Sequence, residues 1–247
     1  GLNNLNDLTL HPRYAALLGI TQEEMERDFA AHIQPFAARA RLPVAELLEK
    51  IRAWYNGFCF SDECVPVYNP FSLLLLFEAQ KFQNYWFESG TPTFLLELLK
   101  TRGYDLQQLE DLQVPELAFS TYEIESLEIV PLLFQTGYLT IKAYNPQNRR
   151  YRLSYPNFEV ENAFLTYLLG TFGAVEKAAA VNSLGHLVTA LLDADWERFF
   201  QALNSFLATI SYELHIRQEK YYQTIFYLIF KLIGLEINAE VRTNQGR

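Results

Sequence analysis

The chain has 247 residues, of which 50% are hydrophobic and 15% aromatic, and this composition excludes an intrinsically disordered protein. Its formal net charge of −9 disfavours a protein that binds nucleic acid over its whole surface, although a local basic patch is compatible with it. The longest apolar run, residues 221–235, contains Lys231 and is shorter than the ~20 residues that a membrane span needs, so we predict no contact with a membrane.

Residues 20–55 carry helical signals. "GLNNLNDLTLHPR" has no basic or apolar leader, which predicts a cytoplasmic protein. Thr21 followed by Glu24 is the pattern of a capping box, and it opens a helix in "TQEEMERDFAAHI". "PVAELLEKIRAWYNG" has apolar residues at helical spacing and is expected to end at Gly57. These two segments predict a pair of helices.

The next segment predicts a hairpin and a second pair of helices. "FCFSDECVPVYNP" alternates aromatic and polar residues around a turn, which is typical of a short hairpin. "NPFSLLLLFEAQKF" and "TPTFLLELLKTRG" follow as helices. In the second of them Thr91 is the predicted N-cap, Pro92 the first helical residue and Gly103 the left-handed C-cap.

A change of pattern near residue 114 predicts a module of a different kind. A short helix is followed by a strand at 138–144, a turn at Asn145-Pro146, a returning strand at 151–155 and a helix after Asn157. This order of helix, hairpin and helix is typical of a winged-helix module. Arg149, Arg150 and Arg152 fall at its wing.

The last third is predicted to be helical until its end. Asp195 is the expected N-cap of "WERFFQALNSFLATI", and a long helix at 219–233 ends at Gly234. "EINAEV" then alternates apolar and polar residues, which predicts a strand that runs toward a Gly246-Arg247 turn. We interpret this as the opening of an α/β unit.

No motif in the chain predicts catalysis by itself. There is no glycine-rich phosphate loop, no Gly-x-Ser-x-Gly turn and no His and carboxylate pair at ligand spacing. Zinc sites need four Cys or His ligands, whereas Cys59 and Cys64 are the only cysteines and the four histidines are scattered. We therefore predict reduced thiols and no metal site.

Eight stretches carry a family resemblance by their order: "GLNNLNDLT", "GITQEEM", "WYNGFCF", "VYNPFSLL", "YWFESGTPTFLL", "LLFQTGYLTI", "YRLSYPNFEV" and "EKYYQTIFYLIFKLIGLEINAEVRTNQGR". In this order the chain resembles the bacterial AAA-ATPase-like proteins that carry a C-terminal PD-(D/E)XK nuclease-like domain. The resemblance covers essentially all 247 residues.

The resemblance implies a mainly α fold with short β-hairpins, divided into four parts. Residues 1–113 correspond to the helical tail or lid of the ATPase-like domain and 114–160 to the winged-helix-like module. Residues 161–210 are a helical linker region, and 211–247 are the start of a restriction-endonuclease-like α/β domain. The phosphate loop of such proteins lies upstream of "GLNNLND", and the metal-binding Asp and Glu-x-Lys lie beyond Arg247.

The same resemblance assigns roles to three residues. Asn3 and Asn4 fall where a sensor strand approaches the ATP γ-phosphate, and an asparagine-rich turn is the alternative. Glu219 corresponds to a helix-borne acidic residue of the nuclease site, with Glu213 as a second candidate. The alternative for Glu219 is a carboxylate that only stabilises a helix N-terminus.

The implied function belongs to a longer parent protein. We expect this chain neither to hydrolyse ATP nor to cut DNA, and to hold no cofactor itself, whereas ATP and Mg²⁺ act in the parent. Arg149, Arg150 and Arg152 are the candidate DNA contacts, although winged modules often serve in packing instead and the acidic net charge favours packing. The parent is expected to process nucleic acid, as an ATPase with a metal-dependent nuclease, and an oligomer is compatible with it. The alternatives are a non-enzymatic interaction module and a purely structural scaffold.

Three further motifs have a structural interpretation that we favour. Asn56-Gly57 and Asn69-Pro70 are able to line a shared pocket, but both are turn-forming pairs. The "WFESGTPTF" stretch offers free backbone amides to an anion, but it also fits a capped helix docked by Trp86 and Phe87.

Overall fold

The computed structural model describes residue 8 and residues 10–89, 93–116, 129–210 and 218–234. As the sequence predicted, helices predominate and the strands form short hairpins. The chain divides into two compact units, and we describe each by itself. The first unit comprises residues 1–91 and 107–161, and the second comprises 92–106 and 162–247. The division into four parts drawn from the resemblance stays a prediction.

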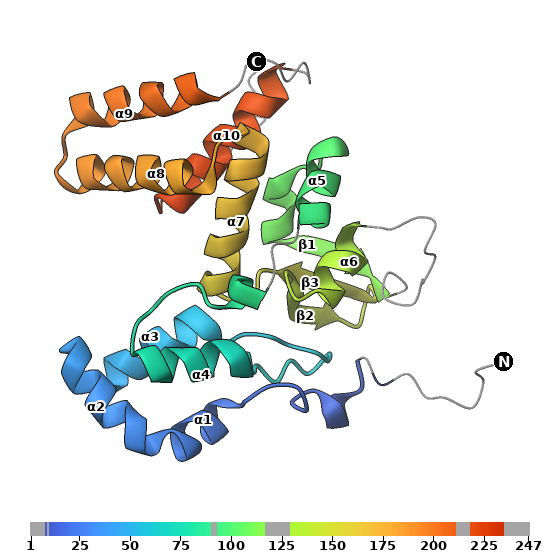
Figure 1. Cartoon of the computed structure of the whole chain (residues 1–247). Coiled ribbons are helices and arrows are strands. Elements are labelled where there is room, and N and C mark those ends of the chain that lie inside the picture. The colour runs from blue at the N-terminus through green and yellow to red at the C-terminus, as the bar shows by residue number, and fades with distance from the viewer. Residues whose placement is uncertain (1–7, 9, 90–92, 117–128, 211–217, 235–247) are drawn as a thin grey trace. The chain divides into compact units, whose positions relative to one another are not determined.

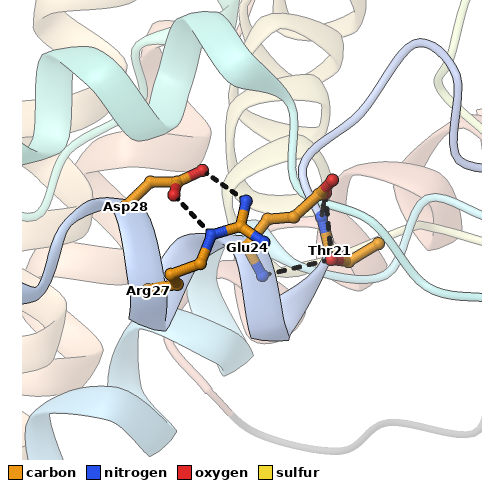
Figure 2. A network of polar contacts seen from close by, with 4 residues as sticks. All are labelled: Thr21, Glu24, Arg27 and Asp28. Carbon is orange, nitrogen blue, oxygen red and sulfur yellow. Dashed lines mark hydrogen bonds and ion pairs between the residues drawn. The ribbon is translucent and has the colours of Figure 1, made fainter.

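Four helices form the N-terminal part of the first unit: α1 (Gln22–Asp28), α2 (Ala30–Ala40), α3 (Val44–Tyr55) and α4 (Pro70–Ala79). The predicted capping box is confirmed, because Thr21 Oγ1 accepts from the Glu24 N–H at 3.2 Å and Glu24 Oε2 accepts from the Thr21 N–H at 2.9 Å. Figure 2 shows the Glu24 side chain turned back to Thr21, with Arg27 facing Asp28 one residue further on.

The helix predicted across residues 21–33 is divided at Phe29. Phe29 leaves helical geometry with φ −103° and ψ 12°, and its ring stacks on Phe77 of α4 at 4.5 Å between centroids. The core of these helices consists of residues that are almost completely buried: Met25, Ile33, Phe36, Ala37, Leu47, Ile51, Tyr55, Tyr68, Leu73, Leu76, Phe77 and Tyr85.

The predicted hairpin after α3 is closed by one isolated bridge, and a second bridge joins it to the residue that precedes Thr21. Phe58 pairs with Val67, and Tyr68 pairs with Ile20. The prediction of reduced thiols is wrong, because Cys59 and Cys64 are joined by a disulfide within this hairpin. The error has a physical reason: the turn brings the two Cα atoms to 4.9 Å, a separation that suits a disulfide and that composition alone does not reveal.

The remainder of the first unit contains the predicted helix and hairpin. These are α6 (Ile129–Gln135), β2 (Thr140–Asn145) and β3 (Arg150–Ser154), followed by α7 (Phe158–Gly173), which begins in the first unit and continues into the second. A strand that sequence reasoning missed, β1 (Leu112–Pro115), pairs antiparallel with β3, so the sheet order is β1-β3-β2 (Figure 1).

The helices of the second unit, beyond its part of α7, are α5 (Thr93–Thr101), α8 (Lys177–Leu192), α9 (Trp196–Thr209) and α10 (Gln218–Leu232). Helices α8 and α9 form an antiparallel pair in Figure 1. The Asp195 cap of α9 is confirmed by a 3.0 Å bond from the Arg198 N–H. Gly103 and Gly234 have the predicted left-handed conformation, with φ of 57° and 84°. Residues 90–92, including the predicted Thr91 cap, lie outside the described residues.

Short 3-10 turns complete the described chain at Pro12–Tyr14, Trp86–Ser89 and Leu106–Glu110. Among the described helices, no single one combines the length and the apolar character that crossing a membrane requires. Helices α7 and α8 meet that test only when taken together, and a bend of 111° separates them.

Candidate nucleic-acid interface

The predicted arginines lie on and beside the central strand of the three-stranded sheet. Successive side chains of a strand point to opposite faces, and β3 accordingly exposes Arg150 and Arg152 while it buries Tyr151 and Leu153. Arg149 precedes the strand in the hairpin turn, where its φ is 53°. The structure therefore places two of the three arginines on one face of the sheet.

The strand register fixes the neighbours of each arginine. Arg152 lies between Gln113 of β1 and Ala143 of β2, and all three residues are exposed. Arg150 lies between Pro115 and Asn145, which are also exposed. Proline is tolerated in β1 because β1 is an edge strand of this sheet. The exposed face thus carries two cations that are flanked by small or uncharged residues.

A groove of about 230 Å³ follows this part of the sheet. Its lining is polar and cationic, and consists of Gln113, Ala143, Tyr144, Asn145, Asn148, Arg150, Tyr151 and Arg152. Pockets for drug-sized molecules are usually larger, at roughly 300 to 1,000 Å³, and mostly apolar. The size and the lining therefore suit a small anionic group, such as one phosphate, better than an apolar ligand.

Carboxylates next to the sheet neutralise part of this charge. Glu116 accepts from Arg149 Nη2 at 2.7 Å and from Nε at 2.9 Å, and this hydrogen bonding raises the pKa of Arg149 above its ordinary value. Arg152 Nε lies 3.9 Å from Asp111 Oδ1. Arg150 makes no ion pair with any residue that the structure describes. Arg150 is therefore the most available cation of the three.

Two tyrosines, Tyr144 and Tyr151, are among the residues that line the groove. Tyr151 donates from its hydroxyl to Asp62 Oδ1 at 2.5 Å, and its ring lies 4.7 Å from the ring of Tyr144. Burial, and then the hydrogen bond to Asp62, raise the pKa of Tyr151 far above its usual range. The hydroxyl therefore stays protonated as a donor at neutral pH, and it ties β3 to the 59–64 turn.

Lys142 of β2 has a structural role next to this site. Its Nζ donates to the Pro156 carbonyl at 2.8 Å, and burial lowers the pKa of the amine. This bond holds β2 to the segment that leads into α7. Lys142 is thus an internal tie of the hairpin rather than a member of the groove lining.

The other predicted site residues lie elsewhere or outside the described chain. Asn3 and Asn4 are outside it, as are Glu213, the predicted 237–241 strand and the Gly246-Arg247 turn. Glu219 lies in the first turn of α10, which begins at Gln218 as the sequence predicted. Glu219 belongs to the second unit, whereas the three arginines belong to the first.

The turn interpretation of the two asparagine pairs agrees with their geometry. Asn56 is the C-cap of α3 and Gly57 has a φ of 118°. Asn69 is the N-cap of α4, and its Oδ1 accepts from the N–H of Phe71 at 2.9 Å. In the "WFESGTPTF" stretch Trp86 and Phe87 pack against Tyr138, with ring centroids at 4.9 and 5.7 Å.

Sequence reasoning missed a buried carboxylate in this unit. Glu159, in the first turn of α7, is fully buried, and its Oε1 accepts from the N–H groups of Tyr85 and Trp86 at 2.7 and 2.9 Å. Sequence reasoning also missed Gln113, the groove residue of β1, because a strand of four residues with one buried side chain carries almost no periodic signal. Within the described ranges no group of three His, Cys, Asp or Glu side chains is placed to hold a metal ion.

Comparison with known proteins adds a relative without an assigned activity. The chain is 37% identical over 254 residues to "Uncharacterized protein in vnfD 5'region" of Azotobacter chroococcum mcd 1. The match covers the whole of this chain but 47% of the relative, so the chain spans about half of that protein's length. No family model matches the chain. No solved structure matches it either.

Proposed function

We propose that the exposed face of the β1-β3-β2 sheet binds the phosphate backbone of DNA. The observation that carries the proposal is the pair of outward arginines, Arg150 and Arg152, beside a polar groove. Guanidinium groups are planar donors that match phosphate oxygens, and two side chains on one face of a strand start about 6.6 Å apart. That separation is comparable to the distance between neighbouring phosphates on one nucleic-acid strand.

The groove lining favours contacts to the DNA backbone, rather than contacts to the bases, as the main source of affinity. Asn145, Asn148 and Gln113 supply amide donors near the two guanidinium groups. Most protein contacts to DNA go to phosphate and sugar, and they come from such side chains as well as from arginine. We therefore expect binding with little sequence preference and strong dependence on salt.

In this proposal the sheet belongs to a winged-helix-like module of a longer, cytoplasmic bacterial protein that processes nucleic acid. The AAA-ATPase-like and PD-(D/E)XK nuclease-like resemblance supports this assignment, as does the order α6, β2, β3, α7. ATP and Mg²⁺ act in the parent protein. Asn3 and Asn4 are the proposed contributors near ATP, and Glu219 is the proposed contributor to the nuclease-like site. The side chains of Asn3, Asn4 and Glu219 lie outside the described atoms.

A second function, a non-enzymatic interaction or scaffold module, is favoured by one observation. Arg149 is paired with Glu116 and Arg152 lies near Asp111, so the protein's own carboxylates already engage two of the three arginines. These pairs are largely exposed, and exposed ion pairs contribute little to stability because water and salt screen them. Replacing either carboxylate by a phosphate therefore costs little free energy. For this reason we favour DNA binding over the interaction module.

The test compares charge reversals of equal size at the groove and away from it. The groove variant is Arg150→Glu, with Arg150→Glu/Arg152→Glu as the stronger form. The control is Arg198→Glu in the first turn of α9, where an acidic residue suits the helix N-terminus. Fluorescence anisotropy with labelled duplex and single-stranded DNA at low salt gives the affinities, and circular dichroism confirms that each variant is folded.

We expect the double groove variant to weaken DNA binding at least about tenfold, and the control to change it about twofold or less. Equal losses in the groove and control variants would indicate a response to net charge alone. Unchanged binding in the groove variants would reject the interface and favour the interaction module.

A further inference from the structure

The turn that bears the disulfide is bonded directly to the strands of the proposed interface. The Cys59 N–H donates to Thr140 Oγ1 at 2.7 Å, and the Thr140 hydroxyl donates back to the Cys59 carbonyl at 3.0 Å. Both residues are almost completely buried, and Thr140 is the first residue of β2. The cysteine turn is therefore fixed to the start of the β2–β3 hairpin.

A second contact joins the same turn to a residue that lines the groove. Asp62 lies between the two cysteines and accepts from the Tyr151 hydroxyl, and Tyr151 stands between Arg150 and Arg152 on β3. The disulfide thus closes a six-residue turn, 59–64, that holds β2 at one point and β3 at another. We call residues 59–64 the cysteine clasp.

The two cysteine residues differ in their exposure to solvent. Cys59 is 1% exposed, whereas Cys64 is partly exposed and follows the exposed residues Asp62 and Glu63. Cys64 also has a φ of 45°, a left-handed conformation that residues other than glycine adopt when their surroundings hold them there. An external thiolate therefore reaches Cys64 Sγ before it reaches Cys59 Sγ, and opening the bond releases Cys64 from its constraint.

We propose that Cys59 and Cys64 form a thiol–disulfide exchange site, open to a dithiol reductant through Cys64, whose redox state sets how firmly the cysteine clasp holds the DNA-binding hairpin. The proposal rests on the proposed function for its DNA readout. It also accounts for a disulfide in a protein that we place in the cytoplasm, where disulfides are mostly transient and redox-sensing.

The exchange balances without any further reactant. One thiolate of the dithiol attacks Cys64 Sγ, the Sγ–Sγ bond breaks, and Cys59 leaves as a thiolate that takes up a proton. The second thiolate of the reductant then attacks the mixed disulfide, forms the reductant's own disulfide and releases Cys64 as a thiol. Two electrons and two protons pass from the dithiol to the protein.

The oxidised form is the tighter DNA binder in this account. Reduction loosens the 59–64 turn, and with it the Asp62 contact that holds Tyr151, the residue between the two arginines on β3. The loss of one hydrogen bond of ordinary strength corresponds to an affinity change of about two- to tenfold. Asp62→Ala removes the contact without touching the cysteines, so it should weaken binding by the oxidised protein by a similar factor and abolish the effect of reduction.

The first experiment establishes the bond and the sulfur that is attacked. Alkylation of the protein prepared without reductant, read by mass spectrometry, should modify neither cysteine until dithiothreitol is added. Of the two single variants, Cys59→Ser, which keeps Cys64, should react with Ellman's reagent faster than Cys64→Ser, which keeps Cys59. Free thiols before reduction, or a faster reaction at Cys59, would overturn the proposal.

The second experiment separates the clasp from DNA binding. Hydrogen exchange of the β2 and β3 amides is measured for the oxidised and reduced forms, with Cys59→Ser/Cys64→Ser as a control that must not respond to dithiothreitol. Faster exchange after reduction supports the clasp even when neither form binds DNA. The absence of DNA binding would then reject only the proposed function. Identical exchange and identical DNA affinity in both redox forms would reject the clasp.

Discussion

Gly57 occupies a backbone conformation and a space that no other residue fits. Its φ of 118° lies in a region that residues with a Cβ rarely adopt, and an added Cβ would stand 2.2 Å from the Pro156 carbonyl oxygen. That carbonyl also accepts the Lys142 amine at 2.8 Å. The contact fixes the end of α3 against the segment between β3 and α7.

We predict that Gly57→Ala lowers the free energy of unfolding by at least about 1 to 3 kcal/mol, because both the conformation and the contact are lost. Gly185→Ala is the matched control. It lies within α8 with no atom within 4 Å of the added Cβ, so helix propensity should stabilise that variant by up to about 1 kcal/mol. Chemical denaturation measures both, and equal effects of the two substitutions would contradict the role assigned to Gly57.

Local capping was predictable from the sequence and distant pairing was not. Thr21 with Glu24, and Asp195 with Arg198, are bonded three positions apart, so the chain order itself indicates each contact. The Tyr151 hydroxyl and Asp62 are 89 positions apart. Such a contact depends on the packing of elements, which no spacing rule encodes. The cysteine pairing is local, at a separation of five positions, and it was missed because the geometry of the turn between the cysteines is not visible in the composition.

At the scale of elements, the sequence revealed the hairpin but not the whole sheet. Alternating aromatic residues on both sides of Asn145-Pro146 predicted β2 and β3 to within two residues at each end. β1 escaped prediction because it has four residues and one buried side chain, and only pairing with β3 defines it. Because β1 was not predicted, Gln113, the β1 residue that lies opposite Arg152 and lines the groove, was not predicted either.

The position of β1 leads to a gain-of-function prediction. Gln113 is exposed and lies opposite Arg152 in the register, so Gln113→Lys adds a third cation to the groove. We predict tighter DNA binding and a steeper dependence on salt, because each added phosphate contact releases further counterions. The control is Gln201→Lys, at an exposed position of α9, measured by anisotropy over the same salt series. A gain of the same size from both lysines would show that net charge, and not the groove, controls affinity.

At the scale of the whole molecule, the first unit buries several tyrosine hydroxyls that resist ionisation. Burial is the main cause that raises the pKa of Tyr55, Tyr68 and Tyr151, and it brings that of Tyr68 to about 12. Each hydroxyl also has a partner: Tyr55 donates to the Gln83 carbonyl at 2.8 Å and Tyr68 donates to Gln22 Oε1 at 2.6 Å. The fold therefore prefers the protonated phenols.

This preference predicts a loss of stability in alkaline solution. Near the ordinary pKa of 10.0 the phenols of the unfolded chain lose their protons, whereas the folded phenols keep theirs. The stabilisation is thus complete below about pH 10 and falls as the pH rises above it. Thermal unfolding between about pH 8 and 11 should show a falling midpoint. The fall should be smaller in Tyr55→Phe than in the control Tyr14→Phe, at an exposed tyrosine; equal falls would contradict the prediction.

The whole chain has a net charge of −9, so a DNA-binding surface on it must be local. The sequence predicted the three arginines as a candidate for that surface, but it could not show that Arg149 is paired with Glu116 while Arg150 remains exposed. Ion pairing depends on where the carboxylates fall after folding. The contact between the exposed arginines of β3 and the DNA phosphates is therefore the central claim, and it needs a direct measurement.

The most direct measurement is the slope of the logarithm of DNA affinity against the logarithm of salt concentration, for the wild-type chain and for Arg150→Ala/Arg152→Ala. Each lost phosphate contact lowers the magnitude of that slope by about 0.9 on duplex DNA and about 0.7 on a single strand. The account predicts a decrease by about two such contacts in the double variant, together with weaker binding at every salt concentration. An unchanged slope in a folded double variant would contradict it and would assign the face to protein packing.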